Sequence, residues 1–181
     1  MPLQLAGALS LAVLILTATL AISGAAEPRD GGRHRGGEVK RDTATVESIT
    51  DGDTINATVH GKTEPIRFIG IDTPETYPVK ECGGGKASKA MARALHPGDR
   101  IKLISDPSQD NRDRYDRILR FVEKRGSDIG RRQIRSGWAD VYVYNHNPFR
   151  RVKEYRAAKA QARHHHRGVF ANCHGHFHRA D

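Results

Sequence analysis

The sequence predicts an α+β protein, mainly β, built on a five-stranded Greek-key barrel with three helices. Three observations predict this fold class. Five short segments are rich in β-branched residues, and turn-forming residues separate them. One helical pattern lies between the third and fourth segments, and two more follow the fifth. The chain has 181 residues, which is enough for one domain with a hydrophobic core.

The first three strands are expected at residues 43–49, 54–60 and 64–71. The first two, TATVESI and TINATVH, are β-branched segments on either side of an Asp-Gly turn signal. The sequence His-Gly-Lys then turns the chain into the third strand. Short turns between consecutive strands predict a meander.

The other elements follow in an order that completes a barrel. A run of three glycines breaks the chain, and a helix is expected over residues 88–95. The fourth and fifth strands are expected at 100–105 and 118–124, separated by a polar loop. A short basic helix at 128–138 and a last helix at 149–163 follow. This order favours the OB-fold, a small Greek-key barrel.

The first part of the chain is not expected to belong to the barrel. Residues 1–26 contain no Asp, Glu, Lys or Arg, and an apolar run occupies residues 9–22. Ser23 and Ala25 have the spacing of a cleavage site, so the segment is interpreted as a secretory signal peptide. The alternative is an uncleaved membrane anchor. The glycine-rich, charged residues 27–42 are expected to be a flexible linker to the domain.

The mature chain is strongly basic. All charged residues follow the first 26, the formal net charge is +9 and the sequence pI is about 9.9. A secreted domain of this charge is expected to attract polyanions, such as nucleic acid, teichoic-type polymers or anionic membranes. The alternative is that the charge serves only solubility.

Cys82 and Cys173 are the two cysteines. An even count in an exported chain indicates one disulfide, which would close a loop of about 90 residues and stabilise the fold by about 4 kcal/mol in the chain-entropy model. Two free thiols are the alternative.

The third strand raises a question about function. Its apolar sequence contains Arg67 and ends in Asp72 and Glu75. With Asp53, which follows the first turn, the carboxylates form a set of hard oxygen ligands suited to a divalent cation such as Ca²⁺. Arg67 and Arg117 could clamp a phosphodiester and stabilise the charge of its transition state. Glu75 would then orient or deprotonate an attacking water.

Each of these short motifs is common when taken alone, as a turn, a strand end or a solvated loop. Together and in order, DGDT, IRFIGIDTPET and DRYDR resemble the staphylococcal-nuclease family over residues 43–170. The resemblance implies an OB-fold barrel with three helices and a secreted Ca²⁺-dependent phosphodiesterase that acts on DNA and RNA. In that family water attacks phosphorus and the 5′-oxygen leaves, so 3′-phosphate ends are expected.

The resemblance also implies roles for single residues. Asp53, Asp72 and the backbone carbonyl of Thr73 would bind calcium, and Arg67 and Arg117 would bind phosphate. Glu75 would act on the water. The residues expected beside the nucleotide are Arg114, Tyr115, Tyr142 and Tyr144. For Tyr142 and Tyr144, packing in the core or at the barrel rim is the alternative.

Three positions depart from the family pattern. Asp116 replaces a glycine, and aspartate tolerates the left-handed turn expected there. Gly130 and Gln133 replace a polar residue and a leucine in the second helix, which is expected to weaken packing without touching the site. The Cys82 and Cys173 positions resemble a pair that is bonded in some secreted members.

The histidine-rich end of the chain, with residues 164–166 and the tail 173–181, admits two interpretations. It could bind Zn²⁺, Ni²⁺ or Cu²⁺. We expect instead a polar, mobile terminus outside the domain, which is placed at 43–172.

Three functions follow from the sequence. The leading one is a secreted, monomeric, Ca²⁺-dependent nuclease acting on DNA and RNA, single strands preferred, with no stable protein partner. A non-catalytic OB-fold module that binds single-stranded nucleic acid is the alternative. The third is an extracellular metal-binding or adhesion protein that acts through its tail.

Overall fold

The structure, a computed structural model, describes residues 37–178. The expected signal peptide, most of the linker and the last three residues of the tail lie outside this range. Within it, none of the helices has the length and apolar character needed to cross a membrane.

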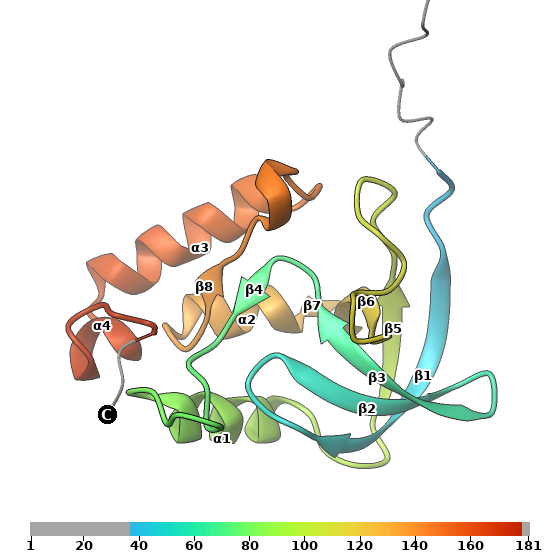
Figure 1. The fold of residues 1–181 in the computed structure, drawn as a ribbon, viewed down its shortest axis with the longest axis horizontal. Coiled ribbons are helices and arrows are strands. Elements are labelled where there is room, and N and C mark those ends of the chain that lie inside the picture. Colours follow the sequence, from blue (N-terminus) through green and yellow to red (C-terminus); the bar gives the residue numbers. More distant parts are fainter. Residues whose placement is uncertain (1–36, 179–181) are drawn as a thin grey trace, which may run out of the picture. The chain divides into compact units, whose positions relative to one another are not determined.

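Five strands close into the barrel that the sequence predicts (Figure 1). They are β1 (Arg41–Ile49), β2 (Thr54–Val59), β3 (Lys62–Phe68), β5 (Arg100–Ile104) and β6 (Ile118–Lys124). Antiparallel pairing runs in the order β3-β2-β1-β5-β6, and a parallel pairing of β3 with β6 closes the ring. The first strand begins at Arg41, so the barrel takes in the last two residues assigned to the linker.

The third strand is shorter than predicted because the chain turns at Gly70. Gly70 has a φ of 79°, and a Cβ placed there would lie 2.4 Å from the Phe149 ring. A glycine is therefore required both for the backbone conformation and for the close approach of the ring. The chain continues as β4 (Ile71–Asp72), which pairs with β8 (Asp140–Val141).

Two further short elements were not predicted. The strand β7 (Ser127–Asp128) pairs antiparallel with the end of β6, and a 3₁₀ turn, η1 (Tyr144–His146), follows β8. Elements of two or three residues carry no periodicity, so sequence patterns cannot reveal them.

The three predicted helices are α1 (Gly84–Ala94), α2 (Ile129–Arg135) and α3 (Val152–His164), and a short fourth helix that was not predicted, α4 (Val169–Asn172), follows them. The first begins four residues before its predicted start, because its first three residues, two glycines and a lysine, carry no apolar pattern. Each end of α2 and of α3 lies within three residues of its predicted position. Helices α2 and α3 pack beside one another (Figure 1).

One hydrophobic core fills the barrel and extends under the helices. Its largest fully buried side chains are Val46, Ile55, Ile66, Phe68, Ile71, Met91, Leu95, Ile101, Leu103, Ile129, Ile134 and Tyr155. Each buried aliphatic side chain of this size contributes about 1.5–3 kcal/mol through removal of apolar surface from water. Because strands from the whole barrel contribute, the core fixes the rim on which the site is built.

A second hydrophobic cluster lies under the C-terminus. Cys173 and Phe177 are buried there, with Val169, and Trp138 packs against them. Cys82 and Cys173 form a disulfide, in line with the even cysteine count. Cys173 is therefore not a thiolate metal ligand. Where the sequence suggested a separate mobile tail, residues 173–178 are packed against the domain, because Phe177 supplies an apolar anchor.

The glycine at position 130 has a packing reason. A Cβ at Gly130 would lie 2.9 Å from the hydroxyl of Tyr155, which is fully buried between α2 and α3. The small residue therefore permits the close approach of the two helices.

Candidate active site

The turn between β1 and β2 presents Asp53 at the rim of the barrel. The carboxylate of Asp51 accepts hydrogen bonds from the backbone amides of Asp53 (2.9 Å) and Thr54 (2.8 Å). This arrangement fixes the turn through the local bonding that aspartate favours. The amide of Phe68 donates to the carbonyl of Asp53 at 3.0 Å, which ties the turn to the end of β3.

Asp53 connects this turn to the strand end at Asp72. Its side chain is buried, and Oδ2 accepts hydrogen bonds from the amide and the hydroxyl of Thr73, both at 3.0 Å. Oδ1 accepts a third from the hydroxyl of Thr54 at 3.1 Å. Two motifs twenty positions apart in the sequence are thereby joined by one carboxylate.

Arg67 lies between the two aspartates. Its Nε is 3.2 Å from Asp53 Oδ1, and its Nη2 is 3.1 Å from Asp72 Oδ1. Nη1 donates to the carbonyls of Phe68 (3.0 Å) and Ile71 (2.7 Å). The guanidinium is thus held rigidly at the end of an apolar strand, which explains why an arginine stands in that strand.

Glu75 lies on the exposed loop that follows β4. Its amide donates to Oε2 of Glu81 at 2.7 Å, and the amide of Glu81 donates to the Glu75 carbonyl at 2.9 Å. Partial burial raises the pKa of Glu75, and the neighbouring carboxylates of Asp53, Asp51 and Asp72 raise it further. The side chain therefore lies in an acidic cluster that favours a nearby cation.

The same excess of negative charge acts on two aspartates. Burial raises the pKa of Asp72, with a further contribution from Asp53, although Arg67 opposes it. Burial and the charge of Asp53 likewise raise the pKa of Asp51. One arginine does not neutralise this cluster.

Arg117 reaches the cluster from the loop before β6. Its Nε and Nη2 are both 2.7 Å from Asp113 Oδ2, and its Nη1 donates to the Thr54 hydroxyl at 3.3 Å. Asp116, just before it, has a φ of 64°, as expected for the residue that replaces a glycine. Burial raises the pKa of Asp113, but the hydrogen bonds from Arg117 and from backbone amides outweigh it and lower the pKa overall.

The candidate nucleotide-contact residues are exposed. Tyr115 is 63% exposed, with the guanidinium of Arg114 at 4.7 Å and that of Arg117 at 5.3 Å from its ring centroid. Tyr142 and Tyr144 are 45% and 53% exposed, and their ring centroids are 6.4 Å apart. These exposures exclude packing of the two tyrosines in the core but not packing at the barrel rim, the other part of the alternative interpretation.

The donors present fit a hard divalent cation. Asp53 and Asp72 approach one another across Arg67, and the backbone of Thr73 lies beside both. Carboxylate and carbonyl oxygens are the ligands of Ca²⁺, and water or substrate oxygens complete its coordination. Among residues 37–178, no three His, Cys, Asp or Glu side chains form a group that could hold a metal.

Four residues at the site were not anticipated from the sequence. Asp113 binds the guanidinium of Arg117, and Glu81 binds the backbone of Glu75. Gln133, buried in α2, donates to the carbonyls of Gly52 (3.2 Å) and Ala87 (2.8 Å), which fixes the turn that carries Asp53. His178 contacts both Asp72 and Glu81. The sequence marked Gln133 only as a polar residue in place of a leucine, and the expectation that it would not touch the site is wrong, because it binds the turn that carries Asp53.

A closed five-stranded barrel whose rim carries paired aspartates, a glutamate and two arginines is the architecture of a staphylococcal-nuclease-like domain. Residues 65–172 match the family model described as "Staphylococcal nuclease homologue", which covers more than half of the chain. The chain belongs to the staphylococcal nuclease family.

Curated relatives support the same assignment. The chain is 30% identical over 141 residues to "Endonuclease YncB" of Bacillus subtilis, covering 76% of this chain and 65% of the relative. It is 36% identical over 107 residues to "SPbeta prophage-derived endonuclease YokF" of B. subtilis, covering 57% and 36%. It is 34% identical over 89 residues to the "Thermonuclease" of Staphylococcus intermedius, covering 47% and 51%. The chain thus spans less than two thirds of the length of these relatives.

Proposed function

We propose that the protein is a Ca²⁺-dependent nuclease that hydrolyses phosphodiester bonds of DNA and RNA with little sequence specificity and leaves 3′-phosphate ends. The observation that carries this proposal is the convergence of Asp53, Asp72 and Arg67 at one end of the barrel, with Glu75 and Arg117 beside them. The printed names of its relatives, endonucleases and a thermonuclease, agree with it.

The arginines bind the reacting phosphate. Arg67 and Arg117 each present a planar fork of donors, which matches two phosphate oxygens and the added charge of a five-coordinate transition state. Arg67 is held by two carboxylates and two backbone carbonyls, and Arg117 by the carboxylate of Asp113 and the Thr54 hydroxyl. Little ordering of either guanidinium is therefore needed when substrate arrives. Calcium, when bound by Asp53, Asp72 and the Thr73 carbonyl, supplies further positive charge to the phosphate.

Glu75 acts on the nucleophile. Its carboxylate orients a water and accepts its proton as the water oxygen bonds to phosphorus. The bond from phosphorus to the 5′-oxygen breaks, so the phosphate stays on the 3′ side and the other product ends in a 5′-hydroxyl. The backbone of Glu75 is held at both its amide and its carbonyl by Glu81, which limits the positions open to the side chain.

The tyrosines account for the proposed substrate range. Tyr115, Tyr142 and Tyr144 expose ring faces on which bases can stack, and stacking tolerates any base. Bases are accessible to such stacking in single strands, which are therefore the preferred substrate. The chain acts as a monomer in this proposal, because the site draws all its residues from one barrel.

Export is part of the proposal. The uncharged residues 1–26 serve as a secretory signal, and the Cys82–Cys173 disulfide suits an oxidising compartment. If the signal is not cleaved, it tethers the enzyme to the membrane.

Protein beginning at Glu27 and its Glu75→Gln variant test the proposal. Each is incubated with single-stranded DNA and with RNA in Ca²⁺ or in a chelator, and the product ends are mapped. We expect calcium-dependent cutting with 3′-phosphate ends, about 10²- to 10⁴-fold slower in the variant because it lacks a general base. Glu154→Gln, an exposed change on α3, is the matched control.

Strands that are bound but left intact at millimolar Ca²⁺ would identify a non-catalytic OB-fold module instead. Cutting that continues unchanged in the Glu75→Gln variant would remove Glu75 from the mechanism.

A further inference from the structure

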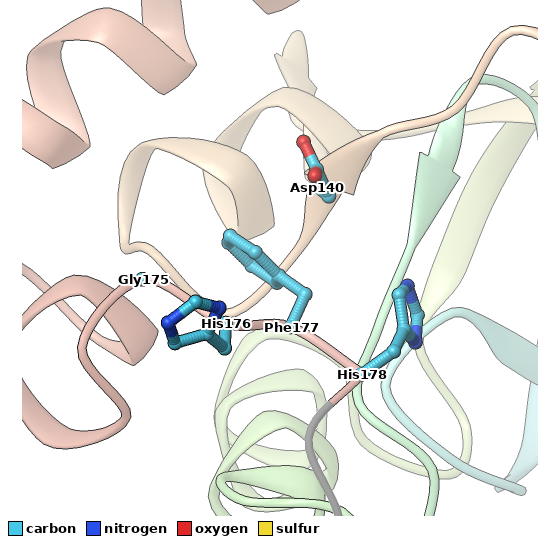
Figure 2. Close-up of a pocket in the computed structure, with 5 residues that line it drawn as sticks. All are labelled: Asp140, Gly175, His176, Phe177 and His178. Atoms are coloured by element: carbon cyan, nitrogen blue, oxygen red, sulfur yellow. The ribbon is translucent and has the colours of Figure 1, made fainter.

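Residues 173–178, here called the C-terminal strap, are fixed to the domain at two points. The disulfide joins Cys173 to Cys82, and the buried ring of Phe177 lies 5.5 Å from that of Phe170 in an edge-on contact. An open pocket lies along the strap and is lined by Asp140, Gly175, His176, Phe177 and His178 (Figure 2). The strap is thus part of the folded domain, and its last residue has a defined position.

His178 at the end of the strap reaches the acidic cluster. Its Nε2 is 3.4 Å from Asp72 Oδ2, and its Nδ1 is 3.1 Å from Glu81 Oε2. Figure 2 shows His176 pointing the other way along the strap, with Phe177 between the two histidines. The structure therefore singles out one histidine of the C-terminal cluster as a neighbour of the site.

Glu81 links His178 to the backbone of Glu75. The same oxygen, Oε2, accepts from His178 and from the amide of Glu75 at 2.7 Å. Glu81 also directly precedes Cys82, where the disulfide attaches the strap. A continuous path of contacts thus runs from Asp72 through His178 and Glu81 to the backbone of Glu75.

We propose that His178 is a positioning residue of the active site: it holds the carboxylate of Asp72 and, through Glu81, the loop that carries Glu75. This role rests on the proposed nuclease function. His178 acts through these two carboxylates and touches neither substrate nor the reacting atoms. The strap thus brings a residue from the far end of the chain to complete the support of the site.

Hydrogen exchange of the backbone tests the structural half of the proposal without requiring any activity. The proteins are the wild type, His178→Ala, His178→Gln and the control His176→Ala, each with the disulfide intact. We expect residues 73–81 to exchange faster in His178→Ala only, because Glu81 loses one of its two partners. Gln can still donate to Glu81, so His178→Gln should retain most of the protection.

Calcium binding by calorimetry and steady-state kinetics test the functional half. We expect His178→Ala to weaken Ca²⁺ binding or lower kcat by about 10- to 100-fold, as for other groups that orient metal ligands. KM for a short single strand and the thermal midpoint should change little. His178→Gln should recover part of the loss, and His176→Ala should match the wild type.

Unchanged exchange in residues 73–81 of His178→Ala would overturn the proposal, as would faster exchange with unchanged Ca²⁺ affinity and kcat. Tighter Ca²⁺ binding in His178→Ala would also overturn it, since His178 would then obstruct the site. If the wild type cuts neither DNA nor RNA, the proposed function fails. The exchange and calorimetric results still decide the role of His178 in that case.

Discussion

Arg67 shows how one residue joins the functional motifs. Its donors serve two backbone carbonyls and two carboxylates from different turns. A lysine presents a single ammonium and cannot match this fork. Phosphate must compete with Asp53 and Asp72 for the guanidinium, and a cation bound by these aspartates would favour that exchange. The site is therefore expected to bind phosphate and metal together better than either alone.

Asp113 holds the guanidinium of Arg117, as Asp53 and Asp72 hold that of Arg67, and this contact gives the first prediction. Asp113→Asn replaces two charge-assisted contacts to Arg117 by weaker ones. Hydrogen bonds to charged groups contribute about 1.5–3 kcal/mol, so kcat/KM should fall by about 10- to 100-fold. Steady-state kinetics on a short single-stranded DNA measures this. Asp110→Asn, an exposed change in the same loop, is the control, and an equal effect of both variants would contradict the assignment.

The residues of the site differ in how far the sequence reveals them. The order and spacing of the motifs predict that five residues meet at one end of the barrel: Asp53, Arg67, Asp72, Glu75 and Arg117. Glu81, Gln133 and His178 have no such signal. Their partners come from the packing of α1, α2 and the strap against the rim, which no local pattern encodes.

At the scale of elements, β7, α2 and α3 are joined by a buried polar network. Asp128 caps α2 by accepting from the amide of Arg131 at 2.9 Å. It also accepts from the Tyr155 hydroxyl at 2.9 Å and from Arg151 at 2.7 Å. Burial raises the pKa of Tyr155 well above its usual value, with Asp128 adding to the effect, so the phenol remains a donor.

Removing Asp128 should therefore destabilise the helical side of the domain. Asp128→Ala loses a cap, which contributes about 1 kcal/mol, and leaves the buried Tyr155 hydroxyl unpaired at a further cost of about 1–3 kcal/mol. We expect a loss of about 2–4 kcal/mol in the free energy of unfolding, measured by urea titration. The exposed Asp110→Ala serves as the control, and a loss below about 0.5 kcal/mol, typical of surface changes, would contradict the role of the network.

The turn between α1 and β5 is tied to β6 through Asp99, which predicts a dependence of stability on pH. The hydrogen bond from Lys124 lowers the pKa of Asp99, with further contributions from the amide and ring of His96. A carboxyl whose pKa is lower when folded stabilises the fold above its unfolded pKa. That stability is lost as pH falls through the lower, folded pKa.

Asp99→Asn should therefore lower the thermal midpoint at pH 7 by about 2–4 °C, as expected for a partly exposed ion pair. The difference from the wild type should shrink below the ordinary aspartate pKa of 3.8 and vanish once Asp99 is protonated in the folded state. Calorimetric scans from pH 2 to pH 7 measure it. A difference that stays constant over this range would show that Asp99 does not stabilise the fold through its charge.

Long strands and helices could be predicted from the sequence, and the shortest elements could not. The five barrel strands and three long helices repeat an apolar pattern over several residues, and each appears near its predicted place. Strands β4 and β8 are two residues long, and their pairing depends on the turn at Gly70 and on Phe149 beneath it. Such contacts arise from the tertiary fold, so periodicity could not reveal them.

At the scale of the whole molecule, an acidic site lies in a basic protein. The chain carries +9 overall, yet the acidic cluster gathers carboxylates whose pKa values are raised by burial and by one another. The net charge attracts a polyanion at long range, while the cluster attracts a cation at short range. This combination suits a negatively charged substrate and a reaction that needs a metal. A module that only binds nucleic acid has no need of the acidic cluster.

The disulfide connects the loop before α1 to the C-terminal strap and gives the last prediction. Cys82 and Cys173 are 91 positions apart, and a loop of that length corresponds to about 4–5 kcal/mol in the chain-entropy model. The Cys82→Ser/Cys173→Ser double variant should lose stability of this order in guanidinium titrations. Reductant should destabilise the wild type in the same way and leave the double variant unchanged.

The same variant separates stability from positioning. Below the unfolding transition of this variant, the strap keeps the packing of Phe177 but has lost its covalent attachment. His178 should therefore hold Asp72 and Glu81 less firmly. Cutting of single-stranded DNA at 25 °C should therefore fall in the folded double variant, and adding His178→Ala to it should lower the rate by a smaller factor than in the wild type. If the two effects simply multiply, the disulfide stabilises the fold but does not act on the site through His178.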